Sequence, residues 1–179
     1  MTRPSEAGLA RQALKHATAA DHERVDDLFA EFRLSDADSY GAFLRAHARA
    51  LAPLEAIANV DVPRLPLLKG DLAALASPFP DVASASTAPE SEAFRWGVRY
   101  ALEGSRLGGA YLARSVPDGL PCGYLSAAHE KGGWAAFQAR LEDAARDEAS
   151  DWIDQAIEGA RHAFALFEAG ARSEGAGHG

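Results

Sequence analysis

The sequence predicts a single all-α domain, a bundle of about seven to nine helices, and three observations support this fold class. Apolar residues make up 47% of the 179 residues, which is enough to bury one core. Alanine, the best helix former, is abundant, and β-branched residues are scarce. Apolar residues recur at helical spacing, without a convincing strand-like alternation, an internal repeat or a domain linker. We therefore expect one domain over residues 1–169 and a disordered tail over residues 170–179.

The first helix is predicted to run without a break from residue 5 to about residue 32. His22 lies three residues before Val25 and seven before Phe29, so it falls on or beside the buried stripe of this helix. His16 lies six residues earlier, about 240° round an ideal helix, and should face elsewhere.

The remaining elements follow from capping residues, prolines and apolar spacing. Ser35 is the expected N-cap of a second helix that reaches Ile57. A loop over residues 59–66, a short helix over residues 67–76, a loop over residues 77–89 and a glycine-rich helix to about residue 114 come next. A turn over residues 117–123 and an ambiguous segment over residues 126–133 lead to a helix from Trp134. Asp147 or Ser150 is expected to cap the last helix.

Composition excludes several classes of function. The net charge of −8 is unlike the basic footprint of a nucleic-acid-binding protein. The single cysteine, Cys122, excludes an internal disulfide and any paired-cysteine metal or haem-attachment motif, and suits a reducing cytoplasm. We expect no secretory leader and no contact with a membrane, because no run approaches the roughly 20 apolar residues that span one.

The stretch Tyr100–Leu112 holds three glycines within six residues, although its flanks favour a helix. Each glycine inside a helix costs about 1 kcal/mol relative to alanine. The glycines either separate two helices, admit a neighbouring helix, or present bare backbone to a flat ligand. Gly104 and Gly108 are four residues apart and share one face, with Gly109 beside them, which is the spacing that a flat ligand needs.

Two motifs in this order resemble those of the haem oxygenase family, and most closely its bacterial members that are associated with phytochromes. The first motif reads Leu14-Lys15-His16-Ala17-Thr18-Ala19-Ala20-Asp21-His22, and the second reads Leu102-Glu103-Gly104-Ser105-Arg106-Leu107-Gly108-Gly109. The resemblance spans roughly residues 9–168. It implies a helical fold and an enzyme that opens haem, at once substrate and cofactor, to biliverdin, CO and Fe²⁺ with O₂ and reducing equivalents. The electrons would come from a ferredoxin or a reductase, and a bacteriophytochrome would accept the biliverdin, with iron acquisition as the competing role.

The resemblance also assigns roles to individual residues. It implies that His22 ligates the haem iron, and that Lys15 contacts a haem propionate. It implies that the helix carrying Gly104, Ser105, Gly108 and Gly109 covers the opposite haem face and directs O₂ chemistry. Phe164 would line the pocket, although plain core packing explains it equally well. Arg140 is a weaker candidate for a propionate contact, because surface solvation is the simpler reading of an isolated arginine.

Ser105 departs from the family pattern. Many haem oxygenases carry an aspartate directly after the first glycine, where it orders distal water, whereas the phytochrome-associated members share the serine. A serine orders water but carries no charge. This residue keeps a second class of function open, a haem carrier or sensor without turnover, beside a third, a helical interaction module that binds no haem.

Overall fold

The computed structural model describes residues 8–82, 91–146, 148 and 150–176, and within them the chain is all-helical, without a strand. This part of the chain contains seven α-helices and one 3₁₀ helix, as expected from the sequence. The helices are α1 (Leu9–Ala17), α2 (Ala19–Ala30), α3 (Ala37–Ala58), α4 (Leu65–Ala74), α5 (Glu92–Leu112), α6 (Gly133–Ala145) and α7 (Ser150–Ser173), with the 3₁₀ helix η1 at Ala113–Ser115. None of these helices is long and apolar enough to cross a membrane.

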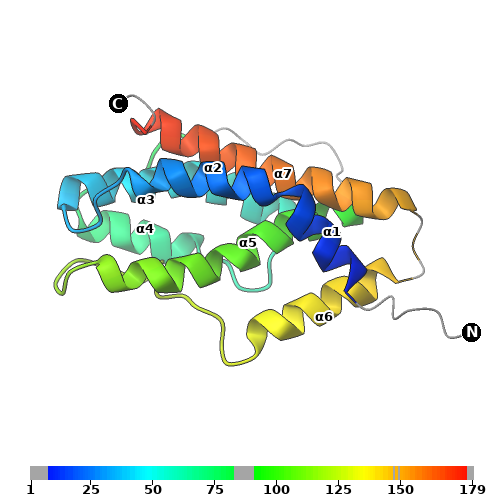
Figure 1. Cartoon of the computed structure of the whole chain (residues 1–179). Coiled ribbons are helices and arrows are strands. Elements are labelled where there is room, and N and C mark those ends of the chain that lie inside the picture. Colours follow the sequence, from blue (N-terminus) through cyan, green and yellow to red (C-terminus); the bar gives the residue numbers. More distant parts are fainter. Residues whose placement is uncertain (1–7, 83–90, 147, 149, 177–179) are drawn as a thin grey trace, which may run out of the picture.

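The helices form two sides around a shared core. Figure 1 shows α2 and α7 side by side along one side of the bundle and α4 and α5 along the other, while α1 and α6 lie together at one end. The long helix α3 packs against α4, α5 and α7. Its buried face supplies much of the core, including Tyr40, Phe43, Leu44, Leu51 and Leu54. Helix α7 packs directly on α5 as well as on α2 and α3, so it connects the two sides of the bundle.

Helix α5 crosses α7 through two glycines. A Cβ atom at Gly97 would lie 1.8 Å from the carbonyl oxygen of Ala156, and one at Gly159 would lie 2.0 Å from the carbonyl oxygen of Phe94. The two backbones are thus in direct contact, which only glycine permits at these positions. This crossing fixes the first half of α5 on the core.

The predicted continuous first helix is wrong, because the chain breaks at Thr18 into α1 and α2. The Thr18 hydroxyl donates to the Leu14 carbonyl oxygen over 2.8 Å, a bond that bends helices. Lys15 and His22 therefore lie on different helices, so their spacing of seven residues, about two turns of one continuous helix, does not place them on one face.

Two predicted N-caps also need correction. Asp36, not Ser35, caps α3, because its carboxylate accepts from the Ser39 amide over 2.9 Å. Helix α7 begins at Ser150, and the alternative cap Asp147 lies outside the described residues.

The predicted disordered tail over residues 170–179 starts too early. Helix α7 continues to Ser173, and a Cβ atom at Gly170 would lie 2.4 Å from the carbonyl oxygen of Ala46 on α3. Glu174 accepts hydrogen bonds from Arg45 over 2.9 Å and from Arg49 over 3.0 Å. Ala176 is buried, and residues 177–179 lie outside the described part. Glu174 is not part of an apolar repeat, so hydrophobic periodicity could not predict its ion pairs with Arg45 and Arg49.

We expect Glu174→Gln to lower the free energy of unfolding by about 2 kcal/mol, because it removes the charge that two arginines share. The Glu174 side chain is only 8% exposed, so solvent does not replace these contacts. Thermal unfolding of the purified protein measures the change. Glu168→Gln is the control, because its two partners, Arg24 and Arg172, are each 51% exposed and the two ion pairs should contribute little. Equal effects of the two substitutions would contradict the prediction.

Candidate functional site

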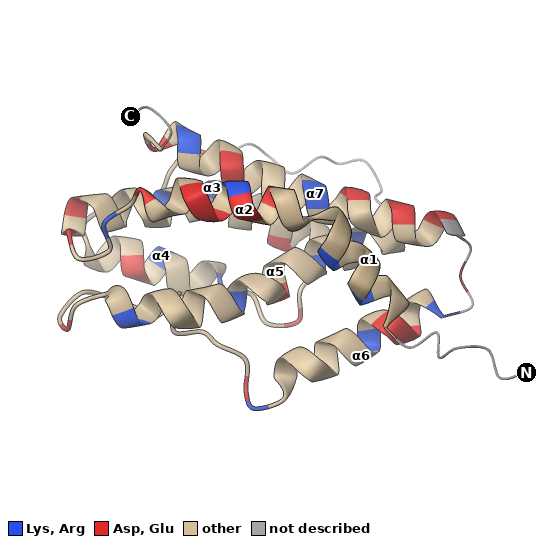
Figure 2. Ribbon diagram, viewed as in Figure 1, with Lys and Arg blue, Asp and Glu red and all other residues tan. Residues whose placement is uncertain are grey.

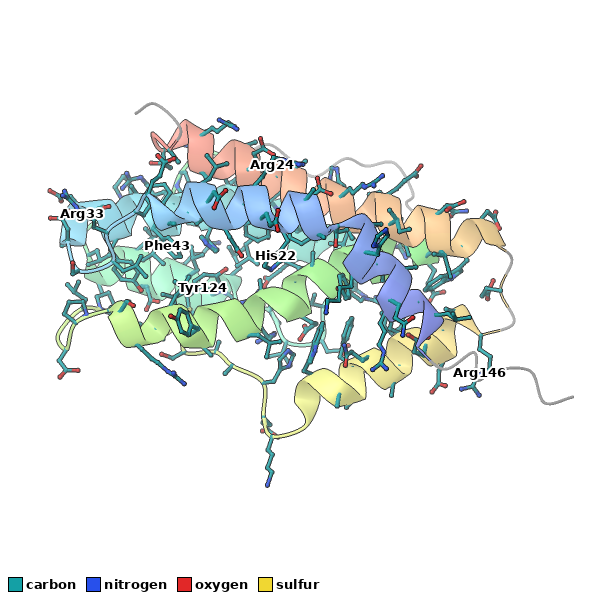
Figure 3. The ribbon with its side chains drawn as sticks, viewed as in Figure 1. His22, Arg24, Arg33, Phe43, Tyr124 and Arg146 are labelled. Carbon is teal, nitrogen blue, oxygen red and sulfur yellow. The ribbon has the colours of Figure 1, made fainter. Side chains whose placement is uncertain are left out.

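His22 presents an accessible imidazole from α2. Its side chain is 61% exposed, so the expected burial is wrong, and in Figure 3 it lies on the side of α2 that faces α5. Its Nδ1 atom lies 3.0 Å from the Asp26 carboxylate. Since a carboxylate only accepts, Nδ1 carries the proton and the lone pair falls on Nε2, the arrangement that suits a metal ligand. The Phe164 ring meets the imidazole edge-on at 5.8 Å between ring centroids.

Sequence reasoning missed Asp26. Glu23 directly follows His22, but it does not orient the imidazole, since adjacent helical residues do not face each other. Asp26 lies four residues after His22, on the same face of α2, and this spacing was the available signal. Both side chains are exposed, so Asp26 orients the ring rather than adding much stability.

The open face of α5 is bare backbone. A Cβ atom at Gly108 would meet nothing within 4 Å, and one at Gly104 would meet only Trp134, at 3.8 Å. Leu107 and Tyr111, on the same stretch, are 48% and 69% exposed. Figure 2 shows few charges along this part of α5, whereas acidic residues gather on α2 and α7. A planar apolar ligand could therefore lie against this helix without a side chain between them.

Gly109 does not belong to that face. It is buried, and a Cβ atom there would lie 3.3 Å from the carbonyl oxygen of Leu125. Gly109 thus lets the segment after η1 pack against α5, which is one of the structural roles that the sequence left open. Gly104 and Gly108 therefore border open space, whereas Gly109 packs against the protein.

Ser105 points into the protein. Its hydroxyl donates to the Leu102 carbonyl oxygen over 2.7 Å, and it accepts from the Arg64 guanidinium over 2.7 Å. Arg64 also donates to the Leu102 carbonyl oxygen over 3.0 Å and is 3% exposed. Sequence reasoning missed Arg64, whose only signal was an arginine between two prolines, Pro63 and Pro66.

A polar pair of the buried Tyr124 and the half-buried His47 continues from Arg64 into the core. The Arg64 guanidinium lies 5.2 Å from the centre of the Tyr124 ring, and the Tyr124 hydroxyl lies 2.8 Å from His47 Nδ1. Burial lowers the pKa of His47 from 6.5 to about 3, and the positive charge of Arg64 lowers it as well. Burial also raises the pKa of Tyr124 above its ordinary value. The pair is therefore neutral at pH 7.

We expect the free energy of unfolding to fall as the pH drops from 6.5 toward 3. In this window the unfolded chain binds a proton at His47 that the folded chain does not, so acid favours unfolding. Denaturant titrations of the protein at several pH values measure this loss. His47→Gln should flatten the dependence, whereas His162→Gln, a change at an exposed position, should leave it intact. A dependence that His47→Gln does not alter would contradict the assignment.

The other predicted site residues are brought together only in part. Phe164 does lie beside His22, as described above. Lys15 is exposed on α1, and no described residue forms an ion pair or hydrogen bond with it. Arg140 is 63% exposed on α6 and faces Asp61 over 3.8 Å, so a surface ion pair accounts for it.

Glu103 and Arg106 attach α5 to the neighbouring loops. Arg106 bonds Glu103 over 3.0 Å and also donates to the backbone carbonyl oxygens of Val62 and Ala127. His129 lies 2.9 Å from the Glu103 carbonyl oxygen. These contacts hold this turn of α5 against the segments that carry Val62, Ala127 and His129.

The chain is similar to known proteins in sequence and in fold. No model of a protein family matches the chain. The chain is 36% identical over 150 residues to a haem oxygenase from Xanthomonas campestris pv. campestris (strain 8004), covering 74% of this chain and 88% of that protein. Its fold matches the crystal structure of the NO- and CO-bound haem oxygenase from Neisseria meningitidis, with a TM-score of 0.77 at 24% identity over 92% of this chain and 90% of that one. By its identity to the Xanthomonas protein over this length, the chain belongs to the haem oxygenase family.

Proposed function

We propose that this protein is a haem-degrading oxidoreductase that opens haem to biliverdin, releasing CO and Fe²⁺, with His22 as the iron ligand. One observation carries the proposal: an accessible imidazole on α2 and bare glycine backbone on α5 belong to the helices that carry the two family motifs. Haem is the substrate, and O₂ and reducing equivalents are consumed with it.

The residues present fit a haem. Neutral imidazole is a common ligand of haem iron, and Nε2 of His22 has no partner among the described residues. The space at Gly104 and Gly108, which a Cβ atom would narrow, accepts the flat macrocycle. Phe164 shields one edge of the imidazole from water. Lys15 remains our candidate for a propionate contact because its ammonium group is exposed, whereas Arg140 already has Asp61 beside it.

The chemistry divides between the ligand and the protein. Bound haem supplies the iron that activates O₂ and the carbon that is oxidised. His22 would hold the haem iron, and Asp26 would fix the orientation of the His22 ring. At Gly104 and Gly108, the absence of side chains would leave room for the macrocycle and for a small molecule such as O₂. Ser105 donates its hydroxyl proton to the Leu102 carbonyl oxygen, so toward water it would act as a hydrogen-bond acceptor.

An absorption time course tests the proposal. The protein is mixed with one equivalent of hemin, and a reductant is added in air. Loss of the Soret band with growth of a broad red biliverdin band is the expected result. A stable Soret band that only shifts on reduction would indicate a haem carrier or sensor. This alternative is kept open by Ser105, which stands where many family members have an aspartate. No Soret band beyond that of free hemin would refute haem binding.

Gly108→Ala should separate the stability of the fold from its function. Without bound haem, the methyl group meets nothing and the helix gains up to about 1 kcal/mol in propensity, so the free energy of unfolding should rise. With haem, the same methyl group occupies the ligand face, and biliverdin formation should fall about tenfold or more. Thermal unfolding and the time course above measure the two effects. A variant that is stabilised and fully active would place haem elsewhere.

We further propose that a ferredoxin or a reductase delivers the electrons and that a bacteriophytochrome receives the biliverdin. These partners rest on the resemblance of the two motifs to phytochrome-associated members of the family. Iron acquisition is the alternative role. Growth of a deletion strain with haem as the iron source, compared with its phytochrome absorbance, distinguishes the two.

A further inference from the structure

Arg64 is a buried cation without an acidic partner. It is 3% exposed, and arginine is almost never buried to this extent unless it is paired. Among the described residues, no carboxylate forms an ion pair with its guanidinium. The nearby Glu55 carboxylate is used by backbone amides, those of Arg64 at 2.6 Å and Leu65 at 3.2 Å.

The guanidinium is directed at the turn of α5 that carries the first glycine. It donates to both the Leu102 carbonyl oxygen and the Ser105 hydroxyl, and the hydroxyl donates to the same carbonyl. A serine hydroxyl has one proton and two lone pairs. At Ser105 the proton and one lone pair are occupied, so a single lone pair remains for a water molecule.

We propose that Arg64 is the positioning residue of this turn: it holds the Ser105 hydroxyl as a hydrogen-bond acceptor and supplies the charge that a carboxylate at position 105 would neutralise. Water beside Gly104 then points a hydrogen at Ser105, and the serine is not the source of a proton. The role in turnover rests on the function proposed above, whereas the arrangement of charges does not.

The charge arrangement is tested without haem, by thermal unfolding of a double-mutant cycle. Ser105→Asp, which introduces the aspartate of many family members, should raise the melting temperature by about 3 °C or more because the carboxylate meets Arg64. In an Arg64→Met background the same substitution should lower it, since the carboxylate has no partner. Equal shifts in both backgrounds would overturn the proposal. If Arg64→Met does not fold, Ser105→Asp is compared with Ser105→Asn, and equal melting temperatures would overturn it.

The chain offers a matched control at Ser77. Arg45 donates to the Ser77 hydroxyl over 2.7 Å, the same distance as at Ser105, but Arg45 is already paired with Glu174. Ser77→Asp should therefore change the melting temperature by no more than about 1 °C. A gain at Ser77 as large as that at Ser105 would show that any carboxylate beside an arginine stabilises this protein, and the proposal would fall.

Haem-loaded protein tests the positioning role. Arg64→Lys keeps the charge but replaces the planar guanidinium, one nitrogen of which donates to both oxygens, with a rotatable ammonium that is not held in that orientation. We expect the affinity for hemin in a titration to stay within about twofold and biliverdin formation to fall about tenfold. A parallel loss of affinity and turnover would indicate a purely structural role and overturn the positioning role. A wild-type protein that binds hemin without turnover would refute the proposed function. The double-mutant cycle of Arg64 and Ser105, measured without haem, would still test the proposed arrangement of charges.

Discussion

His22→Ala is expected to abolish the absorption spectrum of histidine-ligated haem and to lower biliverdin formation at least about 100-fold, more than the loss of a residue that only supports a ligand. The loss should be large because no other described histidine lies beside Phe164 on the side of α2 that faces α5, so no second imidazole can replace His22 as the iron ligand. Hemin titration and the reductant time course measure both effects.

His16→Ala is the matched control for this substitution. His16 lies in the same motif and is exposed on α1, so its loss removes an imidazole without touching the proposed site. Its spectrum and turnover should equal those of the wild type. A normal spectrum in His22→Ala would show that another residue ligates the iron, and a defect in His16→Ala would point to α1 instead.

Gly97→Ala is expected to destabilise the fold by about 3 kcal/mol or more. The added methyl group would lie 1.8 Å from the carbonyl oxygen of Ala156, which is backbone and cannot rotate away. Helices α5 and α7 would have to separate, and the core between them would lose its packing. Denaturant or thermal unfolding measures the loss, and a low yield of folded protein is the extreme form of the same result.

Gly70→Ala is the control for the effect of a methyl group on a helix. Gly70 lies inside α4, and a Cβ atom there would meet nothing within 4 Å. This variant should be as stable as the wild type or more stable, because alanine favours a helix. If Gly97→Ala behaved like Gly70→Ala, the close crossing of α5 and α7 would be contradicted.

Helical periodicity predicted the fold class well, and its failures have local causes. The break at Thr18 depends on one hydroxyl bonding one carbonyl, which leaves the apolar spacing of the helix unchanged. The helical end of the chain depends on Glu174 meeting Arg45 and Arg49 across the fold. Contacts between residues so distant in the sequence leave no repeating pattern of apolar residues, so a single sequence does not reveal them.

The candidate site was predicted in part for the same reason. Residues within one motif, such as His22 and the glycines of α5, could be singled out because the motif shows them together, and their roles stay predictions. Asp26 and Arg64 were missed, since one carboxylate on a charged helix and one arginine in a loop are ordinary features until their neighbours are known. Gly109 was placed on the wrong face because three close glycines were assumed to share one task.

The position of α7 has a consequence for how the chain acquires its fold. This helix packs against α1, α2, α3 and α5, and it brings Phe164 beside His22, yet residues 31–149 separate it from α2 in the sequence. During synthesis the apolar faces of the earlier helices stay uncovered until α7 emerges, because nothing else in the described structure fills its place. Such long-range contacts slow folding and extend the time during which a nascent chain can aggregate. The candidate site, where Phe164 of α7 lies beside His22 of α2, would therefore form late, after most of the chain has left the ribosome.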